Sequence, residues 1–310
     1  MAQPMINVLN FDMSLGDPTT GDPTSDGQSS RYIDLSKELS KVNRKLYRQC
    51  RRYAVAGIQV IGSEGTSVSF FTAMDSWNTK NAIKKAFHAW QKMNKQVLAE
   101  QPSIKPTWHD FKVYLNNDHR MRAATDLQAV PDFDYAPYPN GEWKYSQLVF
   151  PESTEAYCHI HGQHVNNTGA ESSFNPSNIF SVGLIEAYKE SRTAVPLEDP
   201  VTPAMPDVHP WNHLFDDGDT HEDVTDNLKD YNDQAPYAVT SMNGDSNFPI
   251  LYNAAEIRVQ SSEVVNMTNG FVAPCGLIKV ATNQVGGILR LKVFLVPANN
   301  AYGVATEAII

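Results

Sequence analysis

Cationic side chains recur at short intervals between residues 31 and 52. Eight bases stand there against two acids, Asp34 and Glu38. Long cations at this density neutralise the phosphates of a nucleic acid and release their counterions, without reading the base sequence. The alternative is a solvated helix face or a contact between subunits. We predict that the phosphate-binding residues are Lys37, Lys41, Arg44, Lys45, Arg48, Arg51 and Arg52.

Tyrosines are interleaved with these cations. Tyr47 lies inside the basic segment, and Tyr53 follows its last arginine directly. Aromatic rings stack on unpaired bases in sequence-tolerant binding of single strands. We therefore predict that Tyr47 and Tyr53 add stacking contacts to the phosphate contacts.

The negative charge of the chain is concentrated far from the basic segment. Residues 195–235 hold eleven acids and one base, Lys229, so their net charge of −10 equals the formal charge of the whole chain. Such polarity lets one face meet phosphate while another repels it. Thr220 and Asp223 have the spacing of a capping box, which predicts a short helix. We expect a long acidic loop near 195–248, on the outside of any assembly that encloses nucleic acid.

Histidines alternate at positions 159 and 161, a spacing that is typical of a metal site. On a strand both side chains would point to one face, as in the metal-binding pair of a cupin-like metalloenzyme. The acid that such a site needs is not close, because the next one is Glu171. The pattern favours histidines at the surface end of a strand. The acids at 216–223 lack the spacing of a calcium loop and fit a helix cap better.

Composition and motifs argue against an enzyme, a disulfide framework and a membrane span. The chain has no phosphate loop, nucleophile elbow or metalloprotease motif, so we predict no enzymatic activity and no cofactor. The three cysteines, Cys50, Cys158 and Cys275, are widely spaced and predict buried thiols rather than disulfides. No stretch reaches the roughly 18 apolar residues of a membrane span, so we expect no membrane partner.

The elements that must position these residues are mostly strands. Residues 1–30 are rich in Gly, Pro, Ser, Thr and Asp and predict a flexible arm. The basic segment, 31–52, fits either a helix over 32–50 or an extended arm. A helix over 75–99 is indicated by apolar residues at helical spacing, including Ile83, Phe87, Trp90 and Val97. Strands are predicted at 53–61, 66–72, 111–115, 143–150, 155–161, 179–188, 250–259, 271–281 and 288–296.

This order of elements predicts an all-β fold. We expect a single jelly roll over residues 53–310, made of two packed antiparallel sheets, with a helical insertion near 75–99. The acidic loop near 195–248 would be a long surface connection within that domain.

Several blocks of the chain, from the basic segment to the last predicted strand, form a recognisable pattern without a catalytic signature. They are residues 32–36, 42–49, 54–57, 76–78, 85–87, Trp90, 93–95, 106–114, 230–237, 273–278 and 295–297. These blocks resemble capsid proteins of environmental and marine viruses with circular, Rep-encoding, single-stranded DNA genomes. The chain departs from the commoner pattern because residues 1–30 carry four Asp and no base, where many such capsids have a basic tail.

The resemblance implies a viral coat protein that assembles into a small icosahedral shell around circular single-stranded DNA. The implied partners are other copies of the chain, the viral DNA and a host surface receptor. The implied location is the virion, assembled inside the host cell. Two other hypotheses stay open: a nucleic-acid-binding β-domain that works as a monomer or small oligomer, and a cupin-like metalloenzyme built on His159 and His161.

Overall fold

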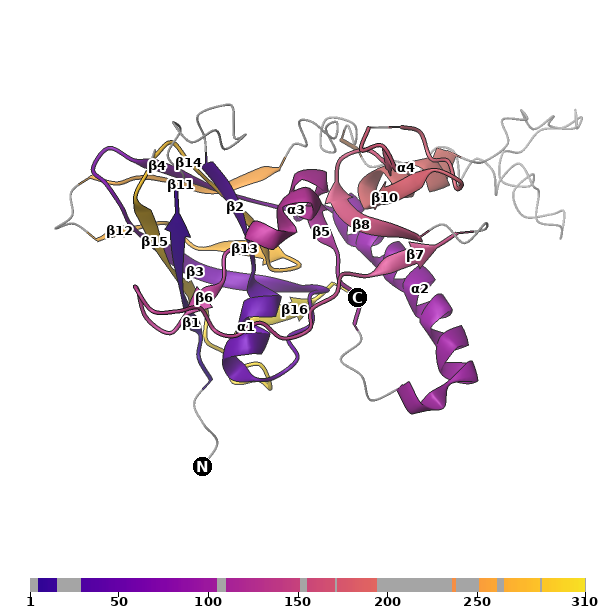
Figure 1. Cartoon of the computed structure of the whole chain (residues 1–310), viewed down its shortest axis with the longest axis horizontal. Helices are drawn as coiled ribbons and strands as arrows, with labels where there is room; N and C mark the ends of the chain where they lie inside the picture. The colour runs from indigo at the N-terminus through magenta and orange to yellow at the C-terminus, as the bar shows by residue number, and fades with distance from the viewer. Residues whose placement is uncertain are drawn as a thin grey trace, which may run out of the picture.

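The computed structural model describes residues 5–15, 29–104, 110–150, 155–170, 172–193, 236–237, 251–260, 265–284 and 286–309. Strand residues outnumber helical residues, and antiparallel sheets pack against each other on the left of Figure 1. This confirms the predicted β-rich class. The acidic loop near 195–248, with its predicted helix, lies outside the described residues except for 236 and 237, so its form and position stay predictions.

The first sheet is antiparallel and contains both ends of the chain. Strand β3 pairs with β15, which pairs with β1, which pairs with β6. Strands β12, β13 and β16 also pair with β3. The bounds are β1 Val8–Ser14, β3 Arg51–Ile61, β6 Ala129–Val130, β12 Asn266–Met267, β13 Phe271–Pro274, β15 Ile288–Leu295 and β16 Thr306–Ala308.

The second sheet has four antiparallel strands in the order β11, β4, β14, β2. Their bounds are β2 Ser29–Asp34, β4 Ser67–Thr72, β11 Tyr252–Arg258 and β14 Leu277–Thr282. Early strands thus pair with late ones in both sheets, β1 with β15 and β2 with β14. Consecutive main strands, such as β3 and β4, also lie in opposite sheets. This pairing and alternation are consistent with a jelly-roll-like fold.

The two sheets enclose one apolar core. Every second residue of β1 is buried, among them Phe11 and Met13, because successive side chains of a strand point to opposite faces. Phe11 joins Leu291 of the first sheet and Phe70 and Val280 of the second in one cluster. Residues 8–14 are therefore a paired, half-buried strand, and the prediction of a flexible arm over 1–30 is wrong for them. Residues 16–28, the polar stretch on which that prediction was based, lie outside the described residues.

A second layer is inserted between β4 and β11. It contains helix α2, Trp77–Glu100, close to the predicted 75–99, followed by the 3₁₀ turn η2, Pro102–Ile104. Ser76 caps α2 by accepting a hydrogen bond from the Thr79 amide. A second apolar core, separate from the one between the two sheets, contains the buried Ile83 and Trp90. Phe87 packs against this second core, whereas Val97 is 47% exposed. We expected these four residues to lie against the sandwich or a neighbouring subunit; for Val97 the contact with the sandwich is wrong, and a contact with a neighbouring subunit stays a prediction.

A third sheet accompanies α2 in this insertion (Figure 1). Strand β8 pairs in parallel with β5 and β10, an arrangement that the expected two antiparallel sheets did not include. Residues 179–188 were predicted as one strand, but β10 ends at Gly183 and helix α4 begins at Leu184. The remaining elements are β5 Tyr114–Asn116, α3 Asn117–Arg122, the 3₁₀ turn η3 Ala123–Thr125, β7 Gln147–Val149, β8 Glu155–His161, β9 Val165–Asn166, β10 Ile179–Gly183 and α4 Leu184–Thr193.

Within the described part of the chain, no helix is both long enough and apolar enough to cross a lipid bilayer.

Candidate nucleic-acid interface

The basic segment begins as a strand and continues as a short helix. β2 ends at Asp34, whose carboxylate caps helix α1, Leu35–Asn43, by accepting from the Lys37 amide. The helix ends at Arg44, which has left-handed backbone angles of φ 54° and ψ 39°. Neither predicted alternative, a helix over 32–50 or an extended arm, describes the whole basic segment, because only residues 35–43 of it are helical.

One face of α1 lines a hollow of about 550 Å³. Lys37, Ser40, Lys41 and Arg44 follow the spacing of three and four residues that places side chains on one helix face. Residues 139–143, ending in Trp143, form the opposite wall. The structure thus brings three of the predicted phosphate-binding residues together around one concave surface.

The cations around the hollow differ in how far they are neutralised. The Lys41 ammonium lies 2.9 Å from the Glu38 carboxylate and also donates to Asn140. The Lys37 ammonium is 3.9 Å from Asp126, the limit of an ion pair. Arg44 is exposed, and no ion pair within the described residues engages it. Burial raises the pKa of Glu38, although Lys41 opposes that shift. Arg44 therefore carries the most available charge.

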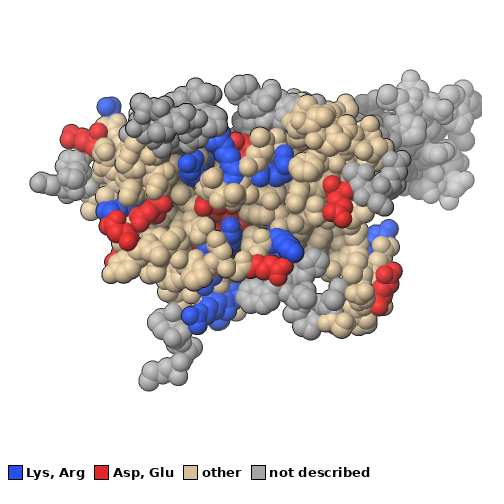
Figure 2. Space-filling model, viewed as in Figure 1, with Lys and Arg blue, Asp and Glu red and all other residues tan. Residues whose placement is uncertain are grey.

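The other predicted cations separate into two groups. The Arg52 guanidinium pairs with Asp75 and Glu307, and the Arg51 guanidinium donates to Thr306. These two side chains fix β16 and the end of β3, so the structure gives them a structural role. Lys45 and Arg48 are exposed, beyond the end of α1. Figure 2 shows Lys and Arg side chains at the lower edge of the molecule, below the place of α1 in Figure 1.

The two tyrosines predicted to stack on bases are buried. The Tyr47 and Tyr53 side chains are 0% exposed and belong to the core between the sheets. Their hydroxyls donate to the backbone carbonyls of Tyr302 and Arg48, respectively. The prediction that they stack on DNA is wrong for this conformation, because no ring face is open to a base.

Helix α2 carries cations that the sequence analysis did not consider as ligands. Lys84, Lys92 and Lys95 are exposed, and no ion pair within the described residues engages them. The only acid within α2 is its last residue, Glu100. The absence of acids between residues 76 and 99 was a sequence signal that could have marked this helix as a second cationic surface.

The histidine pair is buried, not at a surface. His159 and His161 are 0% exposed, which corrects the expected surface position. His159 Nε2 donates to the Gln163 carbonyl at 2.9 Å, so Nδ1 accepts from the Ser181 hydroxyl at 2.7 Å. His161 Nε2 accepts from the Met74 amide. Burial lowers the pKa of His159 to about 3, so the ring is neutral at physiological pH.

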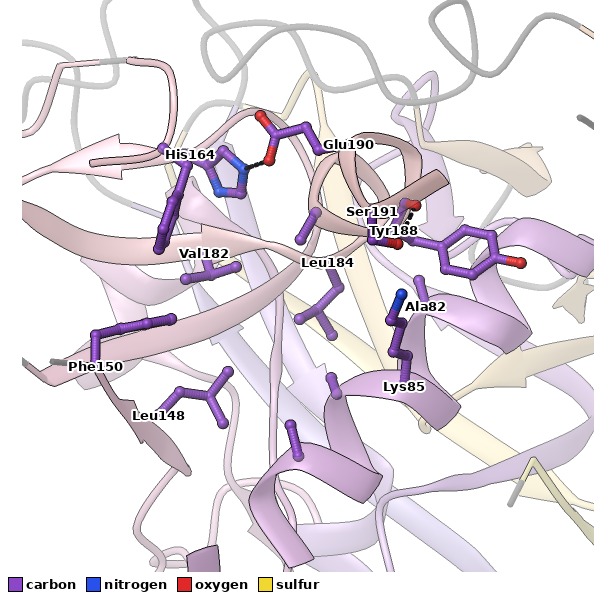
Figure 3. Close-up of a pocket in the computed structure, with 14 residues that line it drawn as sticks. Ala82, Lys85, Leu148, Phe150, His164, Val182, Leu184, Tyr188, Glu190 and Ser191 are labelled. Atoms are coloured by element: carbon purple, nitrogen blue, oxygen red, sulfur yellow. Dashed lines mark hydrogen bonds and ion pairs between the residues drawn. The ribbon is translucent and has the colours of Figure 1, made fainter. Parts of the chain in front are cut away.

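His164 lies at the rim of an apolar pocket of about 380 Å³ between α2, α4 and β10. Figure 3 shows its ring joined to Glu190, with Leu148 and Phe150 on the other side. Nδ1 accepts from the Gly183 amide, so Nε2 donates to Glu190 at 2.9 Å. Both ring nitrogens are engaged, and the described residues contain no group of three or more side chains able to hold a metal ion.

The three cysteines are free and buried, as predicted. Burial raises the pKa of the Cys158 thiol to about 12, and it raises the pKa values of Cys50 and Cys275 as well. Thiols with raised pKa values are poor nucleophiles near neutral pH because the thiolate is the reactive form.

Comparison of the chain with protein-family models, with curated proteins and with solved structures finds no match.

Proposed function

We propose that this chain is a viral coat protein that assembles into a small icosahedral shell around circular single-stranded DNA. The observation that carries the proposal is the pair of packed antiparallel sheets, in which β1 pairs with β15 and β2 pairs with β14. Jelly rolls of this kind form many viral capsids. The resemblance of the sequence blocks supports the same class.

The charge distribution supports a nucleic-acid partner. Arg44, Lys45 and Arg48 are exposed at one end of the molecule, beside a hollow that Lys37 and Lys41 also line. Phosphate binding of this kind is independent of base sequence, as the packaging of a whole genome requires. In the proposed shell this surface faces the interior, and the acidic loop near 195–248 faces outward to a host receptor.

The competing candidate is a nucleic-acid-binding β-domain that acts as a monomer or small oligomer. The hollow beside α1 supports it equally, because DNA binding there needs no shell. Size-exclusion chromatography with light scattering, over a range of salt and pH, separates the two. A species with the mass of many subunits and spherical particles in electron micrographs supports the coat protein. A monomer or small oligomer under every condition contradicts it.

The metalloenzyme hypothesis has no support from the site. Both ring nitrogens of His159 have protein partners, and Nε2 of His161 accepts from the Met74 amide. Stoichiometric zinc, iron or manganese in the purified protein would revive that hypothesis.

A further inference from the structure

Trp143 is the aromatic side chain of the hollow beside α1. The residue follows Glu142 in the segment that faces the helix, and its side chain is partly buried. The described residues that line the hollow are Lys37, Ser40, Lys41, Arg44 and 139–143. A flat indole thus faces three cations across a concave surface.

One face of the indole is already covered. The Lys112 ammonium lies 4.7 Å from the centre of the Trp143 ring, within the range of a cation–π contact. Lys112 itself is buried and does not line the hollow. A base that stacks on Trp143 must therefore use the face opposite Lys112, and Trp143 lines the hollow whereas Lys112 does not.

The Trp143 indole also has an unused hydrogen-bond donor. Its Nε1 atom is buried and has no hydrogen-bond partner among the described residues. A buried N–H group without an acceptor is costly, and a ligand oxygen that reached this atom after a small turn of the indole would remove that cost. Phosphate oxygens and base carbonyls are both acceptors of this kind.

Arg44 is held beside the hollow by an unusual backbone. It is one of three residues other than glycine with positive φ among the described residues. An L-residue with a side chain pays free energy for this conformation, and glycine is the usual residue at such a helix end. Arg44 thus places an exposed guanidinium at the rim of the hollow, with no ion pair to any of the described residues.

The acids near the hollow are paired with cations, so the rim of the hollow stays positive. Glu142 lines the hollow but is paired with Lys144 at 3.2 Å. Glu38 is paired with Lys41, and Asp126 lies closest to Lys37. The guanidinium of Arg44 keeps its full charge, so an anionic group is attracted to that end.

We propose that this hollow binds one nucleotide of a single DNA strand, with its phosphate between Arg44 and Lys37 and its base stacked on Trp143. The inference rests on the proposed function, which supplies the single strand as ligand. A volume of about 550 Å³ is within the range of small-molecule sites, roughly 300–1,000 Å³. A base inside a duplex could not present its face to the indole, so the site selects unpaired strands. Trp143 then takes the stacking role that sequence reasoning gave to Tyr47 and Tyr53.

The test is binding of a fluorescein-labelled oligothymidylate to the full-length protein, followed by anisotropy at several salt concentrations. Trp143→Leu is expected to weaken binding by about tenfold, within the range measured for loss of one stacked base. Trp143→Phe retains a ring and is expected to keep most of the affinity. Arg44→Gln should reduce the slope of log affinity against log salt by about 0.7, the loss of one phosphate contact with a single strand.

Two controls match these variants outside the hollow. Tyr135→Leu removes an exposed ring, and Arg258→Gln removes an exposed cation of β11, a strand that does not line the hollow. Both should bind the oligonucleotide as the wild type does. Circular dichroism of each variant checks that the fold is intact.

The outcomes separate this inference from the proposed function. Folded Trp143→Leu with wild-type affinity overturns the nucleotide site, and if particles still form and protect DNA, the coat-protein proposal stands. Equal losses for Trp143→Leu and Tyr135→Leu also overturn the site. Wild-type protein that forms particles but does not bind the oligonucleotide overturns the site alone. Protein that neither assembles nor binds overturns both.

Discussion

Acidification is expected to destabilise the folded protein through His159. The ring is fully buried on β8, and burial lowers its pKa to about 3 from an ordinary value of about 6.5. Between these two values the unfolded chain binds a proton at His159 that the folded chain does not bind. The free energy of unfolding therefore falls as the pH falls through this window, and the contribution is fully present only above about pH 6.5.

The size of the effect follows from the shift. Each pH unit below about 6.5 costs about 1.4 kcal/mol from this single group. At pH 5 the loss is about 2 kcal/mol relative to neutral pH, a large part of the stability of a typical domain. Protonation would also disturb the pair of hydrogen bonds from His159 to Gln163 and Ser181.

The assay is urea unfolding of the full-length protein, followed by tryptophan fluorescence at pH 7 and pH 5. His159→Gln is expected to lose stability at pH 7 but to show a smaller loss between pH 7 and pH 5 than the wild type. His88→Gln removes an exposed histidine of α2 and should leave the wild-type difference unchanged. If His159→Gln and wild type lose the same free energy on acidification, the argument from the buried neutral ring is refuted.

Three further substitutions test other parts of the structure. Trp90→Ala should lower the free energy of unfolding, measured in urea, by about 3–5 kcal/mol because the ring is in the second core. Val97→Ala changes an exposed side chain and should alter that free energy by no more than about 0.5 kcal/mol. Similar losses for the two variants would contradict the assigned buried face of α2. Arg44→Gly should raise the free energy of unfolding by up to about 1 kcal/mol while it weakens oligonucleotide binding, and a loss of stability would contradict the strain at that position. Tyr47→Phe should lower the free energy of unfolding by about 1 kcal/mol through its lost hydrogen bond and leave DNA binding unchanged, so weaker binding would show that the hydroxyl contacts the ligand.

Local patterns predicted those elements whose limits are set by nearby residues. The helix at 75–99 was found because its apolar residues recur at helical spacing and Ser76 caps it. The strand at 53–61 corresponds to β3, Arg51–Ile61, because β-branched and apolar residues alternate there. The alternation of Leu9, Phe11 and Met13 was an equally clear signal for β1, but the polar residues from 12 onward obscured it.

Features that depend on distant parts of the chain were not predictable in this way. The parallel pairing of β8 with β5 and β10 is set by how the insertion folds back, which no local period encodes. Residues 179–188 divide at Gly183, where a Cβ atom would lie 2.2 Å from the Gly162 carbonyl oxygen. The close approach that requires glycine there involves a residue about twenty positions away.

The candidate site was predictable in part. The stripe of Lys37, Lys41 and Arg44 has helical spacing, and all three residues line one hollow, Lys37 and Lys41 from α1 and Arg44 from the left-handed position at its end. Sequence alone could not show that Arg51 and Arg52 are engaged by residues near the C-terminus. Nor could it show that Trp143 lies opposite α1, because the two are separated by about a hundred residues.

The most direct test of the proposed function is nuclease protection of DNA in assembled particles. Wild-type particles, purified from cells that supply circular single-stranded DNA and treated with nuclease, should retain a full complement of that DNA. Particles of the triple variant with Gln at Arg44, Lys45 and Arg48 should assemble but contain clearly less DNA, because exposed cations that bind phosphate have been removed. Wild-type protein that yields no particles, or particles whose DNA is fully digested, would contradict a coat protein that encloses a single-stranded genome.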